Sequence, residues 1–333
     1  MDAEFRHDQQ HLEADTSDTD SALGDDISAY TQSLRSSLLE SVRENGRGYH
    51  RYLTSSGKDY VMPEDEEEQD RLDLQHHIFE KTFHGKLLLA PVVQDQVHEV
   101  LDLGTGTGAW AIDYADENPE SMVTGTDLSP IQPSLVPPNC KFVVDDFEKP
   151  WLFKQKFDVV HGRVLASSVS SFPALFQRAF DALHPGGWIE MQDICLPLGS
   201  DDGTLSPDCA HARWVEYFME SLEKGLGRSW AWAANYKQWL EEAGFEDVQQ
   251  FIFKWPINTW PKDPRMKEIG GLNLVNCSSG LEGFSLRLFM GVLGMSREEV
   301  EVFLAEVRKD MMNRKIHAYW PMCVQFLCAE LGS

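Results

Sequence analysis

Short runs of apolar residues alternate with longer amphipathic stretches through the middle of the chain. Each apolar run is followed by turn-forming residues, which predicts a buried strand, and the stretches between the runs predict helices. This alternation is typical of βαβ units, which build a mostly parallel sheet with helices on both faces. We expect the first strands at Glu99–Leu103, Met122–Asp127, Lys141–Val144, Phe157–His161 and Trp188–Gln192.

Two further strands are expected towards the end of the chain, separated by a long interruption. The first, Gln249–Lys254, follows a helix at Tyr236–Ala243, and the second is Met322–Cys328. Within the interruption, Ser296-Arg297-Glu298-Glu299 has the spacing of a capping box, which marks the start of a helix. The segment 257–316 is therefore predicted to be a helical insertion that lies over one end of the sheet.

The residues before the predicted sheet differ in composition and in apolar spacing. Residues 1–30 are rich in acidic and small polar residues and predict a disordered acidic tail. Residues 2–8 also match the opening of the amyloid-β peptide, by attachment or by coincidence, and carry no weight in the fold prediction. Apolar residues recur from Ile27 to Arg43 and again around Ile78 and Phe79, as in amphipathic helices. We expect residues 31–95 to form a helical segment covering the binding site, and residues 96–333 to form the core.

Composition narrows the function classes. Among 333 residues the formal net charge is -25, so the field of the protein repels polyanions and argues against general nucleic-acid binding and anionic membranes. We expect no membrane-spanning helix, because no apolar run reaches the roughly 18 residues that one needs. The six cysteines are scattered without metal-ligand spacing, which favours reduced thiols, no metal site, and a cytoplasmic or nuclear protein.

A glycine-rich turn follows the first predicted strand. Gly104, Gly106 and Gly108 lie between the apolar run Leu101–Leu103 and a helical stretch, which is typical of a nucleotide-binding loop. The first glycine permits the tight turn, and the others let a ligand approach the backbone. The spacing also fits the looser dinucleotide pattern, so a nicotinamide-dependent oxidoreductase stays open at this point.

Acidic residues at three strand ends favour a different ligand. Asp102 precedes the glycine turn, where a carboxylate attracts ammonium and sulfonium groups and repels a diphosphate. Asp127 ends the second strand, where it could bind ribose hydroxyls in either type of protein. Asp145 and Asp146 follow the third strand, with Phe147 placed for the face of an adenine ring. Together these positions predict a site for the positively charged cofactor S-adenosyl-L-methionine, with S-adenosyl-L-homocysteine as product.

Several motifs resemble a known group of proteins. The glycine loop, Gly125-Thr126-Asp127-Leu128-Ser129-Pro130 and His184-Pro185-Gly186-Gly187-Trp188 look like a seven-stranded class I methyltransferase. The chain further resembles the LaeA-like fungal methyltransferases at Glu44-Asn45-Gly46-Arg47-Gly48-Tyr49-His50, Asp70-Arg71-Leu72-Asp73-Leu74-Gln75-His76-His77, Gly85-Lys86-Leu87, Asp158-Val159-Val160-His161-Gly162-Arg163 and His317-Ala318-Tyr319-Trp320-Pro321. The resemblance implies a Rossmann-like sheet with a reversed last strand, and the cofactor at the carboxyl edge of that sheet.

The resemblance and the strand-end reasoning together give a set of site residues. His161 is expected beside the transferred methyl as a base or an orienting group, although a hydrogen-bonded strand-end histidine would look the same. Tyr49 is expected to close over the cofactor. The predicted cofactor-binding residues are Tyr49, Asp102, Gly104, Thr105, Gly106, Gly108, Asp127, Leu128, Asp145, Asp146, Phe147 and His161.

The predicted acceptor pocket rests on fewer signals. Arg163 is expected to point the same way as His161, where it could bind an acidic acceptor or pair with Asp145 or Asp146. Aromatic residues near the last strand could line a pocket for an apolar acceptor or could simply be core. The predicted pocket residues are Arg163, Trp230, His317, Tyr319 and Trp320.

Three functions remain in play from the residues alone. The leading hypothesis is a methyltransferase acting on a small molecule, a fungal secondary metabolite or its precursor. The second keeps the fold but makes the chain a nuclear regulator of secondary metabolism, with the acidic N-terminus as an arm for protein partners. The third is the nicotinamide-dependent oxidoreductase, which predicts NAD binding without affinity for S-adenosyl-L-homocysteine.

Overall fold

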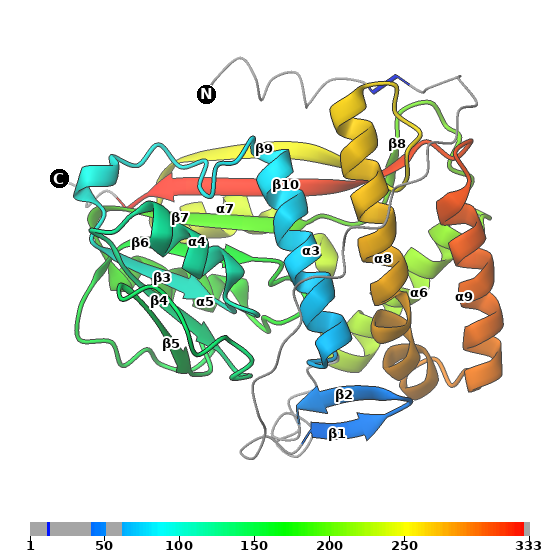
Figure 1. Ribbon diagram of the computed structural model, residues 1–333, viewed down its shortest axis with the longest axis horizontal. Coiled ribbons are helices and arrows are strands. Elements are labelled where there is room, and N and C mark those ends of the chain that lie inside the picture. The colour runs from blue at the N-terminus through cyan, green and yellow to red at the C-terminus, as the bar shows by residue number, and fades with distance from the viewer. Residues whose placement is uncertain (1–11, 14–40, 51–61, 330–333) are drawn as a thin grey trace.

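The central sheet carries the binding site at one edge. The computed structural model describes residues 12–13, 41–50 and 62–329 (Figure 1). The sheet has eight strands in the order β5-β4-β3-β6-β7-β10-β8, and β9 pairs with β10. The strands are β3 (Glu99–Leu103), β4 (Met122–Asp127), β5 (Cys140–Val144), β6 (Phe157–Arg163), β7 (Leu183–Ile194), β8 (Gly199–Ser200), β9 (Glu246–Pro256) and β10 (Ala318–Cys328).

The strand directions confirm the predicted Rossmann-like class I arrangement. Strands β5, β4, β3, β6 and β7 run parallel, and β10 runs antiparallel to both β7 and β9. All seven strands expected from the apolar pattern are present, and the two-residue strand β8 is an addition. The strand order reverses between β3 and β6, which is where open α/β sheets leave a crevice for ligands at their carboxyl edge.

Helices cover both faces of the sheet because alternate residues of each strand point to opposite sides. On β3, Val100 packs in a cluster with Trp110 and Ala111 of α4 (Ala109–Glu117). The next residue, Leu101, lies in a separate cluster that includes α5 (Phe172–Ala182) and α7 (Tyr236–Glu242). Both strand residues are fully buried. These two clusters form the core on the two opposite faces of this part of the sheet.

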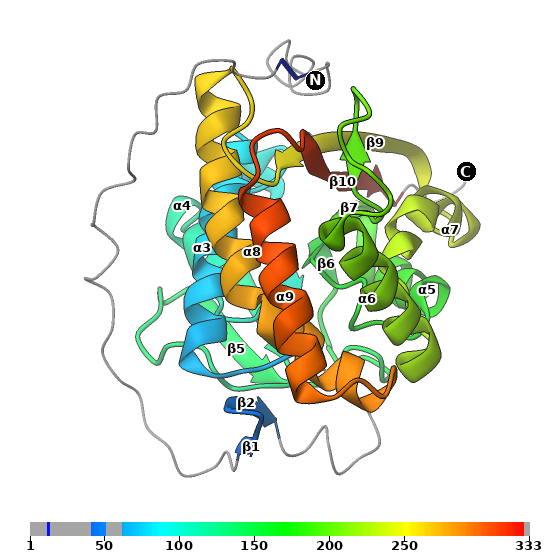
Figure 2. The ribbon, with the colours of Figure 1, turned by 90° about the vertical axis from the view of Figure 1, so that its right-hand side faces the viewer.

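A helical layer covers the end of the sheet where the crevice lies. It consists of α3 (Glu66–Thr82), α6 (Ala210–Leu226), α8 (Pro264–Gly291) and α9 (Arg297–Met312), which lie side by side in Figure 2. Helices α8 and α9 form the insertion expected at 257–316, and α9 begins with the predicted capping box at Ser296 and Glu299. Helix α6 was not anticipated. Two short 3-10 helices, η1 (Gln94–Gln96) and η2 (Trp230–Asn235), complete the described elements.

Part of the helical prediction for residues 31–95 is wrong: the helix expected around Ile78 and Phe79 is present as α3, but residues 41–50 are not helical. Strands β1 (Ser41–Glu44) and β2 (Arg47–His50) form an antiparallel hairpin, so the expected helix from Ile27 cannot extend to Arg43. The reason is local: Asn45 and Gly46 both adopt positive φ, at 55° and 91°, and Asn-Gly strongly favours this two-residue turn. Residues 27–40 lie outside the described part of the chain.

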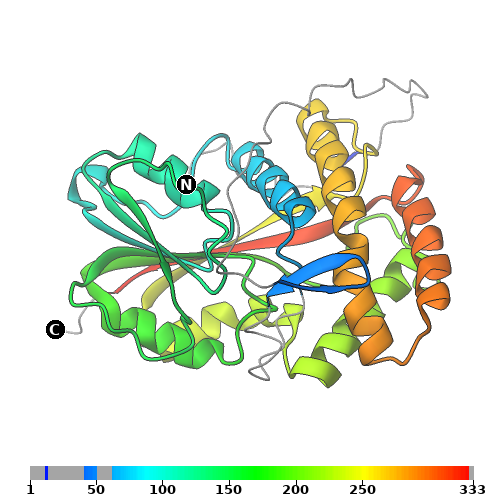
Figure 3. The same cartoon turned by 60° about the horizontal axis from the view of Figure 1, so that its bottom comes forward.

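The hairpin is fixed to the helical layer by charged contacts. Arg47 donates two hydrogen bonds of 2.7 and 2.8 Å to Asp65, the residue that caps α3. Arg287 of α8 lies over the ring of Tyr49 at 4.8 Å, and Figure 3 shows the hairpin beside α3 and α8. Of the predicted acidic tail, the structure describes Leu12, which is buried in the helical cluster, and Glu13, whose carbonyl accepts from Lys262. The rest of that tail lies outside the described residues.

None of the helices within the described ranges combines the length and the apolar character that crossing a membrane requires.

Candidate active site

The glycine loop links β3 to α4 at the point where the strand order reverses. Gly104, Gly106 and Gly108 all have positive φ, between 58° and 85°, which explains why glycine is needed at each. A Cβ on Gly108 would also lie 2.4 Å from the ring of Phe142, so the loop packs tightly on the neighbouring strand. The N–H of Thr105 donates to Thr126 at 2.9 Å. The loop is therefore held in one conformation by its backbone and by the packing beneath it.

Asp127 holds the loop from the next strand. Its carboxylate accepts from the N–H of Gly106 at 2.8 Å and from the N–H of Ser129 at 2.9 Å. Burial raises the pKa of Asp127 to about 6, although these backbone hydrogen bonds oppose the shift. The carboxylate thus stands at the end of β4 with limited solvation, placed to accept from hydroxyl groups of a ligand.

Asp102 sits at the centre of a buried polar group. It accepts from Thr105 Oγ1 at 2.5 Å and bonds with Nδ1 of His161 at 2.7 Å. Because a carboxylate can only accept, the proton of the second bond lies on Nδ1. The imidazole is fully buried and stacks on Trp110 with ring centres 3.7 Å apart. Burial lowers the pKa of His161, and its hydrogen bond with Asp102 opposes that shift, so the ring is neutral near pH 7.

These contacts bear on the two roles predicted for His161. A base must reach the proton that it removes. Nδ1 of His161 is bonded to Asp102 and the ring is stacked on Trp110, an arrangement that favours orienting the Asp102 carboxylate. These contacts favour the orienting role over the base role among the two predicted for His161.

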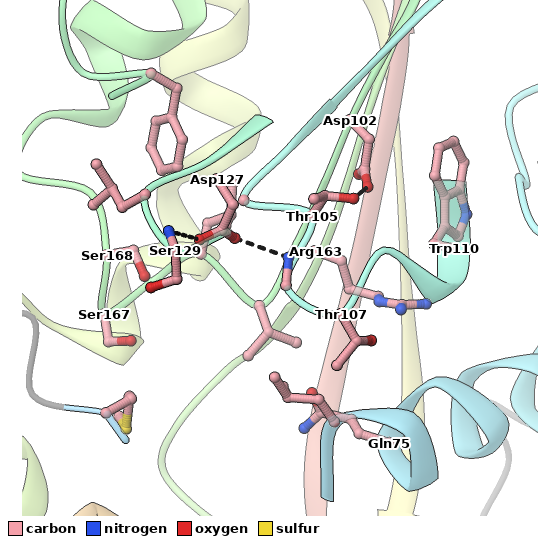
Figure 4. A pocket seen from close by; sticks show the side chains of 18 of the residues that line it. Gln75, Asp102, Thr105, Thr107, Trp110, Asp127, Ser129, Arg163, Ser167 and Ser168 are labelled. Atoms are coloured by element: carbon pink, nitrogen blue, oxygen red, sulfur yellow. Dashed lines mark hydrogen bonds between the residues drawn. The ribbon is translucent and has the colours of Figure 1, made fainter. Parts of the chain in front are cut away.

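A single cavity collects most of the predicted site residues. It opens between the strand ends and the helical layer, and Figure 4 shows Asp102 and Asp127 on either side of Thr105. The predicted residues that line it are Asp102, Gly104, Thr105, Gly106, Asp127, Leu128, Asp146, Phe147, His161, Arg163 and Trp230.

Arg163 does not make the pairing that was one of its two predicted roles. It forms no ion pair with Asp145, Asp146 or any other residue in the described part of the chain. Its guanidinium lies over the ring of Phe79 at 4.6 Å and lines the cavity. Burial lowers the pKa of Arg163 to about 10, so the group keeps its charge at neutral pH. A cation in the cavity without a carboxylate partner can receive an anionic group of a ligand.

Six predicted site residues do not line this cavity. Gly108 caps α4, and Asp145 accepts from the N–H of Asp146 at 2.8 Å. Tyr49 is buried with the guanidinium of Arg287 over its ring. Near the start of β10, His317 bonds with Asp202 and Tyr319 with Asp201, both at the far edge of the sheet. Trp320 lines a second, deeper chamber instead.

The helical layer contributes cavity residues that the sequence reasoning missed. On α3, Glu68, Arg71, Leu72 and Gln75 face the cavity with the spacing i, i+3, i+4 and i+7. That spacing is visible in the sequence, but nothing there indicates which element the face meets. The other missed lining residues are Met62, Thr107, Trp110, Ser129, Glu148, Val164, Leu165, Ser167, Ser168, Arg228 and Phe284.

Outside this cavity, His76 and Glu80 of α3 approach Asp113 of α4 with three potential ligand atoms within 4.8 Å of one another. A 2.7 Å bond between His76 Nε2 and Asp113 already accounts for the closest pair. The sequence predicts no metal site, and these three residues give no independent sign of one.

Known proteins are similar in sequence to most of this chain. The profile of the methyltransferase domain family matches residues 74–250. The methyltransferase pytC of Aspergillus terreus is 40% identical over 314 residues, which cover 94% of this chain and 93% of that protein. The probable methyltransferase tdiE of Emericella nidulans is 37% identical, covering 78% of this chain and 81% of that protein.

A regulator of secondary metabolism has nearly the same sequence identity to this chain. The secondary metabolism regulator LAE1 of Cochliobolus heterostrophus is 38% identical, covering 83% of this chain and 91% of that protein. The family match sets aside the oxidoreductase alternative, because the glycine loop with Asp102 belongs to a methyltransferase domain. The chain therefore belongs to the S-adenosyl-L-methionine-dependent methyltransferases, in the group that includes the LaeA-like proteins of fungal secondary metabolism.

Proposed function

We propose that this protein transfers the methyl group of S-adenosyl-L-methionine to a small molecule of fungal secondary metabolism. The observation that carries the proposal is the course of the cavity, which runs from the strand ends into the helical layer. Its walls include Arg71 and Gln75 of α3, Trp230 of η2 and Phe284 of α8. An acceptor reached through such a space must fit between helices, which suits a small molecule.

The cavity residues suit the parts of the cofactor in turn. Asp127 would accept from the two ribose hydroxyls, and Asp146 and Phe147 would contact the adenine. Asp102 and Arg163, on adjacent strands, present opposite charges to the same cavity. A carboxylate and a guanidinium together match the ammonium and carboxylate of an amino acid. We assign the methionine end of the cofactor to this pair.

When bound, the cofactor supplies a methyl group on a cationic sulfur, and the protein's contribution is mainly alignment. Holding an acceptor in line with that methyl can supply much of the acceleration. His161 and Trp110 fix the Asp102 carboxylate, and the rigid glycine loop fixes the backbone next to it. The helical layer then sets where the acceptor stands and excludes water from the reacting groups.

Two measurements test this proposal. Isothermal titration should detect binding of S-adenosyl-L-homocysteine but not NAD. The purified protein, without partners, should then transfer label from methyl-labelled S-adenosyl-L-methionine to a component of a fungal metabolite extract. Binding of NAD in place of S-adenosyl-L-homocysteine would contradict the cofactor assignment. Binding without any transfer to the extract would count against a small-molecule acceptor.

The regulator hypothesis is the second candidate, because the 38% identity to LAE1 is close to that of the enzymes named above. In that role the acidic N-terminal residues would recruit protein partners. Affinity purification of the full chain from fungal nuclear extract, compared with a chain lacking residues 1–30, distinguishes the two. A stable complex that depends on those residues, together with no small-molecule methylation, would favour the regulator.

A further inference from the structure

A groove beside strand β9, the β9 groove, shares no lining residue with the cofactor cavity. It is bounded by residues 85–92, by the last turn of α4 and by one face of β9 and β10. Residues 85–92 belong to the segment that joins α3 to β3, which runs along β9 and β10 in Figure 1. The volume of the groove is about 620 Å³, within the range usual for small-molecule sites.

The floor of the β9 groove is apolar and aromatic. Phe251 and Phe253 point to the same face of β9, and Phe326 of β10 lies beside them. The rings of Phe251 and Phe326 stack with their centres 5.6 Å apart. Leu87 and Leu88 line the groove from the segment between α3 and β3. A ligand of this size therefore gains most of its affinity from contact with apolar side chains.

The polar residues of the groove favour an uncharged ligand. Lys86 and Glu117 are the two charged residues among the described residues that line it, so their charges balance. Burial and the nearby carboxylates of Asp113 and Glu80 raise the pKa of Glu117, and a ligand anion would add to this repulsion. Any ionic ligand would also lose hydration against the aromatic floor. Amide side chains, such as that of Gln249, can instead bond to an oxygen of a neutral ligand.

The wall formed by residues 87–90 is fixed on its inner side. Glu190 of β7 accepts from the N–H groups of Leu89 and Ala90 at 2.8 and 2.7 Å. The carbonyl of Leu87 accepts from the indole N–H of Trp110 at 2.9 Å. Trp110 lines the cofactor cavity. The backbone of the groove is thus bonded directly to a residue of the cofactor site.

Trp110 stands between the two sites. Its ring stacks on Tyr114, which lines the groove, with centres 5.0 Å apart. On the other side it stacks on His161 at 3.7 Å, and His161 bonds with Asp102 at 2.7 Å. Two lining residues of the groove, Leu87 and Tyr114, therefore contact the side chain that helps to fix the Asp102 carboxylate.

We propose that the β9 groove binds an uncharged, mainly apolar small molecule with a hydrogen-bonding oxygen, and that this molecule raises the affinity for the cofactor. The effect on the cofactor rests on the function proposed above. A molecule in the groove restrains Leu87 and Tyr114, and through them Trp110 and His161. The cofactor then meets a site that needs less ordering, so the two ligands bind with positive cooperativity.

The first experiment measures binding with a probe of this chemistry. Prodan, a neutral naphthalene dye with one ketone oxygen, is titrated into the full chain saturated with S-adenosyl-L-homocysteine, and its fluorescence is followed. We expect saturable binding to one site. Anilinonaphthalene sulfonate keeps the fused rings but carries a fixed negative charge, so it should bind about tenfold more weakly. Equal affinity for the two dyes, or no saturable binding of prodan, would overturn the proposal.

Neighbouring residues of β9 supply matched variants, because they point to opposite faces of the strand. Phe251→Asp places a charge in the groove and should weaken prodan binding about tenfold. Ile252→Asp makes the same kind of change at a residue that is 46% exposed and does not line the groove, so affinity should stay within about twofold.

A second pair of variants keeps the apolar floor intact. Gln249→Glu removes the amide donors at the edge of the groove and should weaken prodan binding about fivefold, whereas Gln250→Glu should change it less than about twofold. Equal effects within either pair would refute the groove as the binding site. Sedimentation velocity is run alongside, because a dimer that prodan dissociates would assign the groove to a second copy of the chain and overturn the proposal.

The coupling is measured by calorimetry. Saturating prodan should lower the Kd for S-adenosyl-L-homocysteine about fivefold, and S-adenosyl-L-homocysteine should lower the Kd for prodan by the same factor. Trp110→Phe keeps a ring but removes the donor to Leu87, so the factor should fall below about twofold while both ligands still bind. Trp260→Phe removes an indole donor that bonds to Ala318 and should keep the full factor.

The outcomes separate this inference from the proposed function. No coupling in the unmodified protein, or the same coupling in Trp110→Phe, would overturn the inference. No binding of S-adenosyl-L-homocysteine to the unmodified protein would instead refute the proposed function. Prodan binding without the cofactor product, compared between Phe251→Asp and Ile252→Asp, would still decide whether the groove is a ligand site.

Discussion

At the scale of single residues, Asp127 meets two opposing demands. The N–H groups of Gly106 and Ser129 stabilise its negative charge, while burial raises its pKa to about 6. The same carboxylate thus organises the glycine loop and, under the proposed function, also accepts from ligand hydroxyls. Asp102 differs, because its two hydrogen bonds come from side chains that also fix its direction.

Removing the Asp127 carboxylate should weaken cofactor binding. Asp127→Ala loses two hydrogen bonds to a charged acceptor, so we expect the Kd for S-adenosyl-L-homocysteine to rise about 100-fold. Isothermal titration measures the change. The control is Asp116→Ala, which removes an exposed carboxylate of α4 and should leave the Kd within about twofold. A similar loss in both variants would point to general electrostatics in place of ribose contacts.

The raised pKa of Asp127 also predicts the pH dependence of binding. Below about pH 6 the free carboxyl is protonated, and the ligand must then displace a proton to find an ionised acceptor. The Kd for S-adenosyl-L-homocysteine should therefore be nearly flat from pH 7 to 8 and rise up to about tenfold at pH 5. Asp127→Asn should bind more weakly at every pH and without this rise. A rise of the same size in Asp127→Asn would assign the titration to another group.

The cavity residues at the strand ends could be predicted from the sequence, and the surroundings that the helical layer supplies could not. Asp102 lies near the end of β3, Asp127 ends β4 and Asp146 follows β5, and parallel strands bring their carboxyl ends to one edge. His211 carries no such local signal: it lies in the first turn of α6 and lines the second, deeper chamber with Trp320 only because α6, α8 and β10 pack together. Nothing in the nearby sequence distinguishes it from a surface histidine.

At the scale of elements, both the backbone conformation and the packing restrict the glycine turn to glycine. Gly108 has φ +85° and a Cβ there would meet the Phe142 ring, whereas Gly203 has φ +73° with open space around it. Gly203→Ala should cost about 1–2 kcal/mol from backbone strain alone. Gly108→Ala should cost about 2–4 kcal/mol, because overpacking adds to the strain.

Chemical denaturation of the two variants measures these losses in the free energy of unfolding. Equal losses would show that Phe142 moves aside without cost. Binding of S-adenosyl-L-homocysteine supplies a second measurement, since only Gly108→Ala distorts the loop that Asp127 holds. Gly203→Ala should keep the affinity of the unmodified protein.

Helices and strands were predicted best where a local sequence pattern alone determines their bounds. The strands β3 and β4 begin and end at the expected residues, because short apolar runs end at an acidic or glycine-rich turn. The hairpin β1–β2 was missed because loose apolar spacing outweighed the Asn45-Gly46 turn signal. Helix α6 was missed although Trp214, Phe218 and Leu222 recur at helical spacing on its buried face, so a local signal for it is present in the sequence.

At the scale of the whole molecule, the buried carboxyl groups make the stability of the fold depend on pH. Glu190 accepts from the N–H groups of Leu89 and Ala90, and Asp193 accepts from Leu165 and from the hydroxyl of Tyr236. Both acids lie on the central strand β7 and tie the loops around it to the sheet. Burial raises the pKa of each to about 7, against the effect of these hydrogen bonds.

These shifts predict that the ligand-free protein loses stability as pH rises from about 4 to 7. In that range the folded chain holds protons on Glu190 and Asp193 that the unfolded chain has already released, so the free energy of unfolding falls with pH. Across the window this loss of stability is about 3 kcal/mol for Glu190 and about 4 kcal/mol for Asp193. The net charge of -25 acts in the same direction through self-repulsion, so the test must separate the buried carboxyls from the surface charge.

Urea unfolding at pH 5 and pH 8 measures how steeply the free energy of unfolding falls with pH. Asp193→Asn should roughly halve this slope, since Asn does not titrate. Asp116→Asn, which removes one exposed charge, should leave the slope nearly unchanged, and an equal flattening by both variants would assign the pH dependence to surface charge.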